Sequence, residues 1–155
     1  MSNPDQGLDL RLEIRIAASP ETVFGLLTDP TQMKMWLAEI VEAEARPGGR
    51  FLISGPSGLT IEGTYVEAIP HKKVMFTWGG VEGLKPGQST VEFLLEPDGA
   101  GTLVRLRHFG LPASAVEPHR RGWTYSGLVK LKDIAEGRRP ARLCLSDIAE
   151  QGGSL

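Results

Sequence analysis

The three histidines are the side chains best suited to acid–base chemistry near neutral pH in this chain of 155 residues. His71 lies in a turn segment and His119 lies near the start of a helical stretch, so we expect both to face solvent. His108 differs because it continues the inward alternation of Val104 and Leu106 at the end of a strand. An inward imidazole could orient a polar ligand group or transfer a proton, or it could be a hydrogen-bonded core residue. Both interpretations stay open.

The carboxylates and hydroxyls give little support for an enzyme. Glu62, Glu92 and Glu96 fall on the outward phase of their strands, so no pair of carboxylates converges on one site. Tyr65 shares the inward phase of Ile61 and could supply a hydroxyl. The catalytic motifs GxSxG and HExxH and the phosphate-binding motif GxxxxGK[ST] are absent. We therefore do not expect an enzyme, and no catalytic residue is assigned.

Metal, nucleic-acid and membrane functions also lack support. The single cysteine, Cys144, has no CxxC partner, so neither a disulfide nor a metal site is expected, and no motif calls for a cofactor. The net charge is −2, whereas nucleic-acid-binding domains are usually basic. The first ten residues do not read as a signal peptide, and no apolar run approaches the ~20 residues of a membrane span. The expected location is cytoplasmic.

The elements that must position these side chains follow from the hydrophobic pattern. Residues 8–16, "LDLRLEIRI", alternate between apolar and charged side chains, which is typical of a strand with one wet face. Ser19 and Pro20 suit a helix start, and Asp29-Pro30 ends that helix before a second short one over 31–37. Residues 39–108 predict six further strands joined by short turns, hence antiparallel neighbours.

The last strong element is "HRRGWTYSGLVKLKDIAEG", residues 119–137, which predicts a helix that Glu117 and Pro118 could begin. Gly122 and Gly127 lie inside it, and each glycine costs about 0.5–1 kcal/mol relative to alanine. Gly127 shares a face with Trp123. The missing side chain could permit close packing or leave space for a ligand beside the indole, and both explanations stay open.

The order of elements and several local stretches resemble the SRPBCC or START-like superfamily, whose helix-grip fold also occurs in pathogenesis-related allergens. Within it, the chain is most similar to bacterial homologues of the activator of heat-shock protein 90 ATPase. The resemblance runs from about Leu8 to Gly137 and is carried by "ASPETVFGLLTDP", "MKMWL", "GTYVEAIPHKKVMFTW", "GTLVRLRHFGLP" and the helical stretch above. The chain departs from the family in having a single Trp36 where a tryptophan pair is frequent, and in an additional tail after Gly137.

The resemblance implies an α+β fold: a seven-stranded curved antiparallel sheet around a long C-terminal helix, with two short helices after the first strand. We expect residues 1–140 to form this domain and residues 141–155 a C-terminal tail, which could be a partner or dimer element. A hydrophobic cavity between sheet and helix would bind a small apolar or aromatic molecule. The residues expected to line it are Trp36, Phe51, Ile61, Tyr65, Phe76, Trp78, Phe93, His108, Trp123 and Gly127.

Two alternatives come from other functional classes. One is an interaction domain like the chaperone-ATPase activators, which would make a chaperone the partner and leave a homodimer open. The other is a cyclase or hydrolase-type enzyme, which would need His108 or Tyr65 as acid or base. A roomy interior would favour a ligand or substrate, whereas a filled core with an exposed apolar patch would favour an interaction domain.

Overall fold

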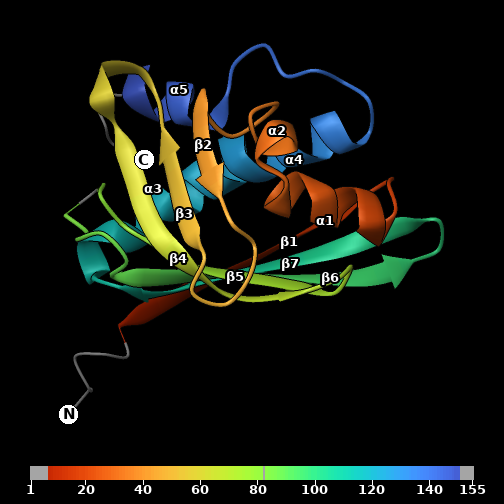
Figure 1. The fold of residues 1–155 in the computed structure, drawn as a ribbon, viewed down its shortest axis with the longest axis horizontal. Coiled ribbons are helices and arrows are strands. Elements are labelled where there is room, and N and C mark those ends of the chain that lie inside the picture. Colours follow the sequence, from red (N-terminus) through yellow and green to blue (C-terminus); the bar gives the residue numbers. More distant parts are fainter. Residues whose placement is uncertain (1–6, 82, 151–155) are drawn as a thin grey trace.

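The computed structural model describes residues 7–81 and 83–150 and consists of one curved antiparallel sheet with helices on its concave side (Figure 1). The sheet has the strand order β1-β7-β6-β5-β4-β3-β2, so only the first strand is out of sequence order. The strands are β1 (Leu8–Ile16), β2 (Ile40–Ala43), β3 (Arg50–Ser54), β4 (Thr60–Ile69), β5 (Lys73–Trp78), β6 (Ser89–Asp98) and β7 (Gly101–Leu111). The predicted seven strands and their antiparallel pairing are confirmed.

The alternation along β1 decides how the two ends of the chain meet. Its apolar side chains point to the concave face, and β1 pairs with β7 in a register that sets Leu10 opposite His108 and Leu12 opposite Leu106. Strands β2 to β7 follow one another as neighbours because short turns join them. His108 therefore points inward from a strand that has neighbours on both sides.

The two short helices after β1 are α1 (Pro20–Thr28) and α2 (Pro30–Met33). Ser19 caps α1 by accepting a hydrogen bond from the backbone N–H of Thr22. Asp29 ends α1 and also caps α2, where its side chain accepts from the N–H of Thr31 at 2.9 Å. The second helix is shorter than predicted, and α1 packs over β5, β6 and β7.

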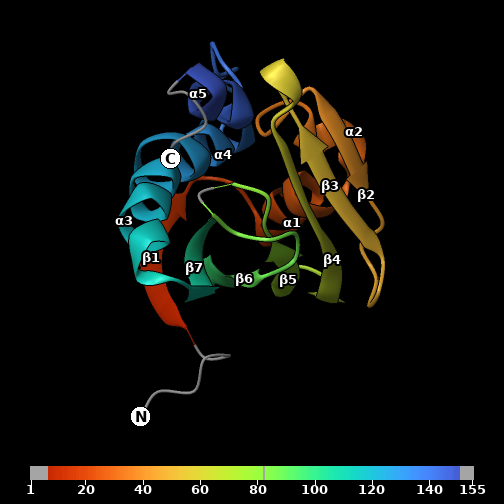
Figure 2. The same ribbon diagram turned by 90° about the vertical axis from the view of Figure 1, so that its left-hand side faces the viewer.

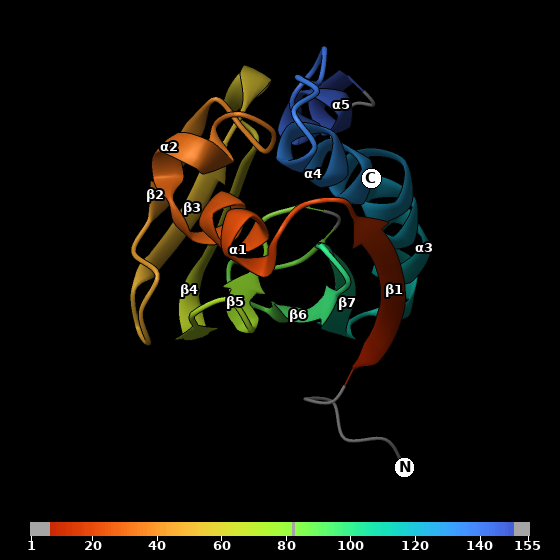
Figure 3. The same ribbon diagram turned by 90° about the vertical axis from the view of Figure 1, so that its right-hand side faces the viewer.

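The C-terminal helix has three parts: α3 (Ala113–Gly122), a π-helical turn (Trp123–Gly127) and α4 (Leu128–Ala135). It begins four residues before Glu117, so the predicted start at Glu117 and Pro118 is wrong, and Pro118 lies inside α3. Pro112 precedes the first turn and does not need to donate a hydrogen bond there. Figures 2 and 3 show α3 and α4 beside β1 and β7, with the sheet curving around the helices toward β2.

A last helix, α5 (Cys144–Glu150), lies within the range expected to be a tail. Cys144 and Leu145 are buried and belong to the same hydrophobic core as the sheet. Their backbone N–H groups donate to the carbonyl oxygens of Trp36 and Leu37, both at 2.9 Å. The first residues of α5 therefore complete the packing of the domain. Within the described ranges, no helix combines the length and the apolarity that a membrane crossing needs.

Candidate functional site

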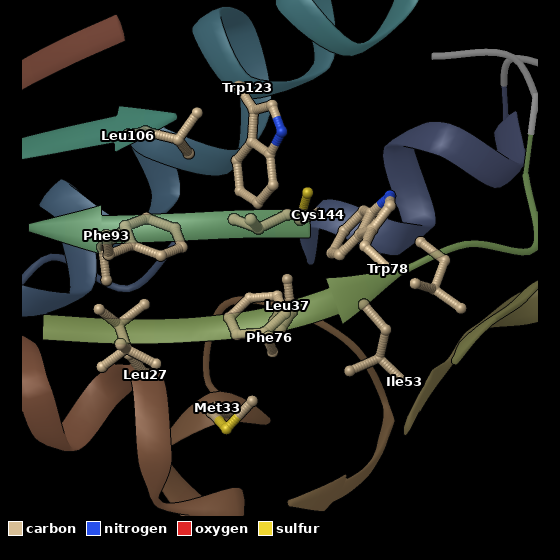
Figure 4. Close-up of a cluster of buried hydrophobic side chains, with 14 of the residues drawn as sticks. Leu27, Met33, Leu37, Ile53, Phe76, Trp78, Phe93, Leu106, Trp123 and Cys144 are labelled. Atoms are coloured by element: carbon tan, nitrogen blue, oxygen red, sulfur yellow. The ribbon is translucent and has the colours of Figure 1, made fainter. Parts of the chain in front are cut away.

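The concave face of the sheet carries a cluster of aromatic side chains that meets the C-terminal helix (Figure 4). Phe51 of β3 stacks on Phe76 of β5 with ring centroids 4.1 Å apart. Trp123 of the π turn meets Trp78 of β5 at 5.3 Å and Phe93 of β6 at 5.8 Å. All five rings are buried. The strand alternation predicted the inward direction of the four rings on the strands, helical spacing placed Trp123 on a helix face with Gly127, and the structure brings these predicted site residues into one cluster.

The π turn explains why the helix holds a glycine beside Trp123. A β-carbon on Gly127 would lie 2.6 Å from Cε3 of the Trp123 indole, closer than real side chains approach. The ring of Trp123 therefore lies directly over the position where a side chain of residue 127 would begin. The structure accounts for Gly127 by close packing, in this case against an indole of its own helix.

His108 and His119 lie side by side at one end of the aromatic cluster, with ring centroids 4.8 Å apart. Both are fully buried, so the expectation of a solvated His119 is wrong. His119 lies in the last turn of α3 and not at a helix start, because the helix begins earlier than predicted. His71 is exposed, as expected.

Two tryptophans hold these histidines through direct hydrogen bonds. The indole Nε1 of Trp123 donates to Nδ1 of His108 at 3.1 Å, and that of Trp78 donates to Nε2 of His119 at 3.2 Å. Ser89 donates its hydroxyl to the carbonyl oxygen of Trp78 at 2.7 Å and lies 2.8 Å from Nε2 of His108. His119 Nδ1 lies 2.8 Å from the carbonyl oxygen of Ala115. The two indole bonds link the C-terminal helix to the sheet, the contacts of Ser89 link neighbouring strands, and the His119–Ala115 contact lies within α3.

These contacts determine the tautomers of the neutral rings. An indole N–H only donates, so the ring nitrogen that it meets carries no proton. His108 is then protonated on Nε2 and donates to Ser89, while His119 is protonated on Nδ1 and donates to Ala115. Both ring nitrogens of each histidine are engaged. A substrate could reach His108 only by replacing Trp123 or Ser89, which disfavours a role as a free acid or base.

Burial and the neighbouring His119 hold the pKa of His108 well below its usual range, and burial is the larger cause. His108 is therefore neutral at physiological pH. A proton on Nδ1 would also set two N–H groups against each other at the Trp123 contact. The arrangement suits a neutral hydrogen-bonding partner inside an apolar interior.

The remaining predicted site residues lie in the adjoining core. Trp36 donates its indole N–H to the carbonyl oxygen of Leu26 at 2.9 Å, and the Tyr65 hydroxyl donates to that of Leu27 at 3.0 Å. Burial raises the pKa of Tyr65, so this phenol stays protonated and makes a poor base. Ile61 is fully buried in the same core. Both polar groups are thus tied to the end of α1.

Three contributors to this region were missed by the sequence reasoning: His119, Ser89 and Cys144. Ser89 shares the phase of Val91 and Phe93 on β6, so the alternation could have placed it inward. Cys144 belongs to a short helix whose position depends on contacts with Trp36 and the π turn. No local sequence pattern predicts a contact of this kind. No group of three potential metal ligands occurs among the described residues.

A hollow of about 410 Å³ lies elsewhere, on the outer face of the sheet. Outward-pointing ion pairs of β1, β6 and β7 surround it, and Arg105 contacts Glu13 at 3.7 Å and Glu96 at 3.5 Å. Arg107 lies over the ring of Phe109 at 4.3 Å. These groups are solvated and pair with one another. This hollow has the character of a charged sheet surface.

The comparisons with known proteins agree with this architecture. Residues 17–136 match the family described as Activator of Hsp90 ATPase homolog 1-like protein. The solution structure of an AHSA1-like protein from Rhizobium etli is 34% identical, with a TM-score of 0.68, covering 87% of this chain and 86% of that chain.

Two further solved structures share the fold. An HSP90 activator from Plasmodium falciparum is 25% identical, with a TM-score of 0.68, covering 83% of this chain and 96% of that chain. The Aha1 dimer from Colwellia psychrerythraea is 22% identical, with a TM-score of 0.72, covering 84% of this chain and 97% of that chain. The search of curated proteins found no match.

Proposed function

Because the chain belongs to the family of Activator of Hsp90 ATPase homolog 1-like proteins, within the SRPBCC/START-like superfamily, we propose that it binds a small apolar or aromatic molecule between sheet and C-terminal helix. The aromatic cluster of Phe51, Phe76, Trp78, Phe93 and Trp123 would contact the molecule. Ligand sites of this kind are mostly apolar with a few placed polar groups, and the two Trp–His pairs supply those groups.

The π turn at Trp123–Gly127 is the observation that carries this proposal. A π turn is rare in helices and occurs frequently at functional sites. Here it directs one indole onto the aromatic cluster and the same indole's N–H onto a buried histidine. Simple core filling needs neither an irregular helix nor a buried polar pair, because an apolar side chain on a regular turn would pack as well.

The hydrogen bonds limit the chemistry of the bound molecule. A ligand with one acceptor could take the Trp123 N–H from His108, since an indole donates to any well-placed acceptor. A planar molecule would stack on these rings only where two of them separate, because Phe51 and Phe76 already stack at 4.1 Å; such ring pairs gain about 0.5–1.5 kcal/mol beyond area burial. Turnover is not part of the proposal, because His108 and Tyr65 are both held by internal partners.

Binding of the uncharged dye N-phenyl-1-naphthylamine, whose fluorescence rises in apolar surroundings, tests the proposal. Phe93→Leu changes the cluster, while Phe109→Leu makes the same change on the outer face of the neighbouring strand. We expect Phe93→Leu to weaken binding at least fivefold and Phe109→Leu to leave it unchanged. Equal binding by both variants, or no binding by the unaltered protein, would overturn the proposal.

A second candidate is stimulation of a chaperone ATPase. It is favoured by the family match and by the likeness to the HSP90 activator from Plasmodium falciparum at 25% identity. Exposed apolar residues Tyr125 and Val129, one helical turn apart, would then be candidate contacts. Measuring the ATPase rate of Hsp90 with and without this protein tests it. An unchanged rate at saturating protein removes this candidate and leaves ligand binding unaffected.

A further inference from the structure

The helix α5 (Cys144–Glu150) contacts both the β2–β4 side of the sheet and the C-terminal helix. At one side it contacts the segment before β2 and the short 3-10 turn η1 (Pro56–Gly58), and at the other it contacts the π turn of the C-terminal helix. Figures 2 and 3 show α5 at the same end of the molecule as α4 and the β3–β4 turn. It thus connects the C-terminal helix to the β2–β4 side of the sheet.

The attachment of α5 combines the buried side chains of Cys144 and Leu145, and their two backbone hydrogen bonds, with a few polar contacts. Asp147 accepts from Ser126 at 2.7 Å and pairs with Lys130 at 2.9 Å, which fixes α5 to the C-terminal helix. Arg142 pairs with the other oxygen of Asp147 at 3.0 Å. On the opposite side, Leu145 lies against Gly55, where an added β-carbon would be 3.3 Å from the Leu145 β-carbon. No strand ladder includes α5.

The inner side of α5 faces the aromatic cluster. Cys144 is buried in the same hydrophobic core as Trp123 and Trp78, and Figure 4 draws all three side chains in that cluster. Leu145 belongs to the same continuous core. If α5 moved away, it would uncover one side of the cluster without breaking any pair of strands.

The connection that precedes α5 is suited to a hinge. Residues 137–139 and 141–142 are exposed, and Gly137 has a φ of +89°, which side-chain-bearing residues rarely adopt. Segments with few buried contacts open with less free energy than the whole domain. The match to the family model ends at residue 136, before α5 begins.

We propose that α5 is a strap that closes the entrance to the apolar interior and must lift before a ligand enters. This inference rests on the proposed ligand-binding function. The closed strap would cover one end of an interior whose aromatic rings contact one another directly. It also assigns Cys144 and Leu145 to the wall of the ligand site, although they lie beyond the matched family region.

A reversible covalent lock tests the strap on one and the same protein. Gly55→Cys with Leu145→Cys, in a Cys144→Ala background, brings two β-carbons to a separation close to the 3.5–4.5 Å of disulfides. We expect the oxidised form to take up N-phenyl-1-naphthylamine at least tenfold more slowly than the reduced form. Cys144→Ala alone controls for the reductant. Equal uptake rates in a protein that binds the dye would overturn the strap and spare the ligand site.

A second measurement needs no ligand and tests the strap even if the protein does not bind the dye. Burial raises the pKa of the Cys144 thiol to about 11, so the closed form offers almost no reactive thiolate. Labelling by 5,5′-dithiobis(2-nitrobenzoate) therefore reports lifting of α5. Asp147→Ala should accelerate labelling at least tenfold, whereas Glu117→Ala, which removes an exposed ion pair with Arg120 on α3, should not.

The dependence on urea completes this test. A strap that lifts locally gives a labelling rate that depends weakly on low urea concentrations, because little surface is exposed. Labelling that follows the urea dependence of global unfolding, and that Asp147→Ala leaves unchanged, would overturn the strap. Failure of dye binding with rapid local labelling would instead refute the ligand proposal alone.

Discussion

The two faces of the sheet differ in how their polar groups are accommodated. The outer face spreads charges in exposed pairs, such as Arg105 with Glu13 and Glu96. The inner face carries very few polar groups, and His108 is fully buried with a partner on each ring nitrogen. The outer pairs are numerous and individually weak, because water screens them. The inner hydrogen bonds are few, and a lost partner leaves an unsatisfied group in an apolar interior.

The hollow on the outer face and the candidate site on the inner face differ in the same way. The hollow of about 410 Å³ lies over exposed charged pairs that satisfy one another. The inner cluster combines an irregular helix turn, aromatic faces and directed indole N–H groups. The proposed binding is therefore assigned to the inner face, where the side chains are held in defined orientations.

The largest expected effect comes from removing the ring that joins helix and sheet. Trp123→Ala should lower the free energy of unfolding by about 3–5 kcal/mol, because the indole is 4% exposed and His108 loses its donor. Tyr125→Ala, two residues along the same turn and 77% exposed, is the control and should cost below about 0.5 kcal/mol. Urea melts measure both. A loss below about 1 kcal/mol for Trp123→Ala would break the distinction between inner and outer positions.

The next effect concerns the glycine beneath that ring. Gly127→Leu should destabilise the domain by about 1–3 kcal/mol or more, because its β-carbon meets the indole of Trp123 at 2.6 Å. Helix propensity acts in the opposite direction and favours leucine by several tenths of a kcal/mol. A thermal melt decides which term dominates. A raised midpoint would mean that the indole can move aside and that open space exists beside it.

The pH dependence of stability should reveal the buried imidazole. Because the pKa of His108 is lowered in the folded state, its contribution is fully present above its unfolded pKa of ~6.5 and is lost as the pH falls. One proton corresponds to about 1.4 kcal/mol of lost stability per pH unit below ~6.5. Urea unfolding midpoints at pH 7.5 and pH 5.5, about one unit on either side of the unfolded pKa of ~6.5, measure this loss of stability. Identical slopes for the unaltered protein and His108→Gln would contradict this role.

The smallest effect is expected on the outer face. Arg105→Ala removes contacts with Glu13 and Glu96 and should change stability by about 0.2–1 kcal/mol. The difference should shrink in high salt, where exposed charges are screened. Urea melts at low and high ionic strength check this. A loss comparable to that of Trp123→Ala would show that the outer charges hold the sheet together.

The sheet was predictable because alternation is a local property of each strand. The inward direction of Phe51, Phe76 and Phe93 followed from neighbours two positions away, and the structure agrees. The start of α3 was missed because Pro118 is read as a helix start, while here it lies inside a helix that Pro112 precedes.

The partners within the site were not predictable in the same way. The bond from Trp78 to His119 joins residues 41 positions apart and depends on how α3 lies on the sheet. The placement of α5 likewise depends on Trp36, Leu37 and the π turn, none of which is local in sequence. The periodicity of an element indicates which of its faces a side chain lies on. It does not indicate which residues of another element that side chain will contact.

The most direct test of binding at the inner face uses the three indole N–H signals in a ¹⁵N-correlated NMR spectrum. Trp78 and Trp123 donate to the buried histidines, whereas Trp36 donates to a backbone carbonyl at the end of α1. On addition of N-phenyl-1-naphthylamine, we expect the Trp123 and Trp78 signals to shift in a saturable way and the Trp36 signal to move least. Saturable shifts confined to backbone amides around Arg105 and Phe109, with all three indole signals unmoved, would contradict the account.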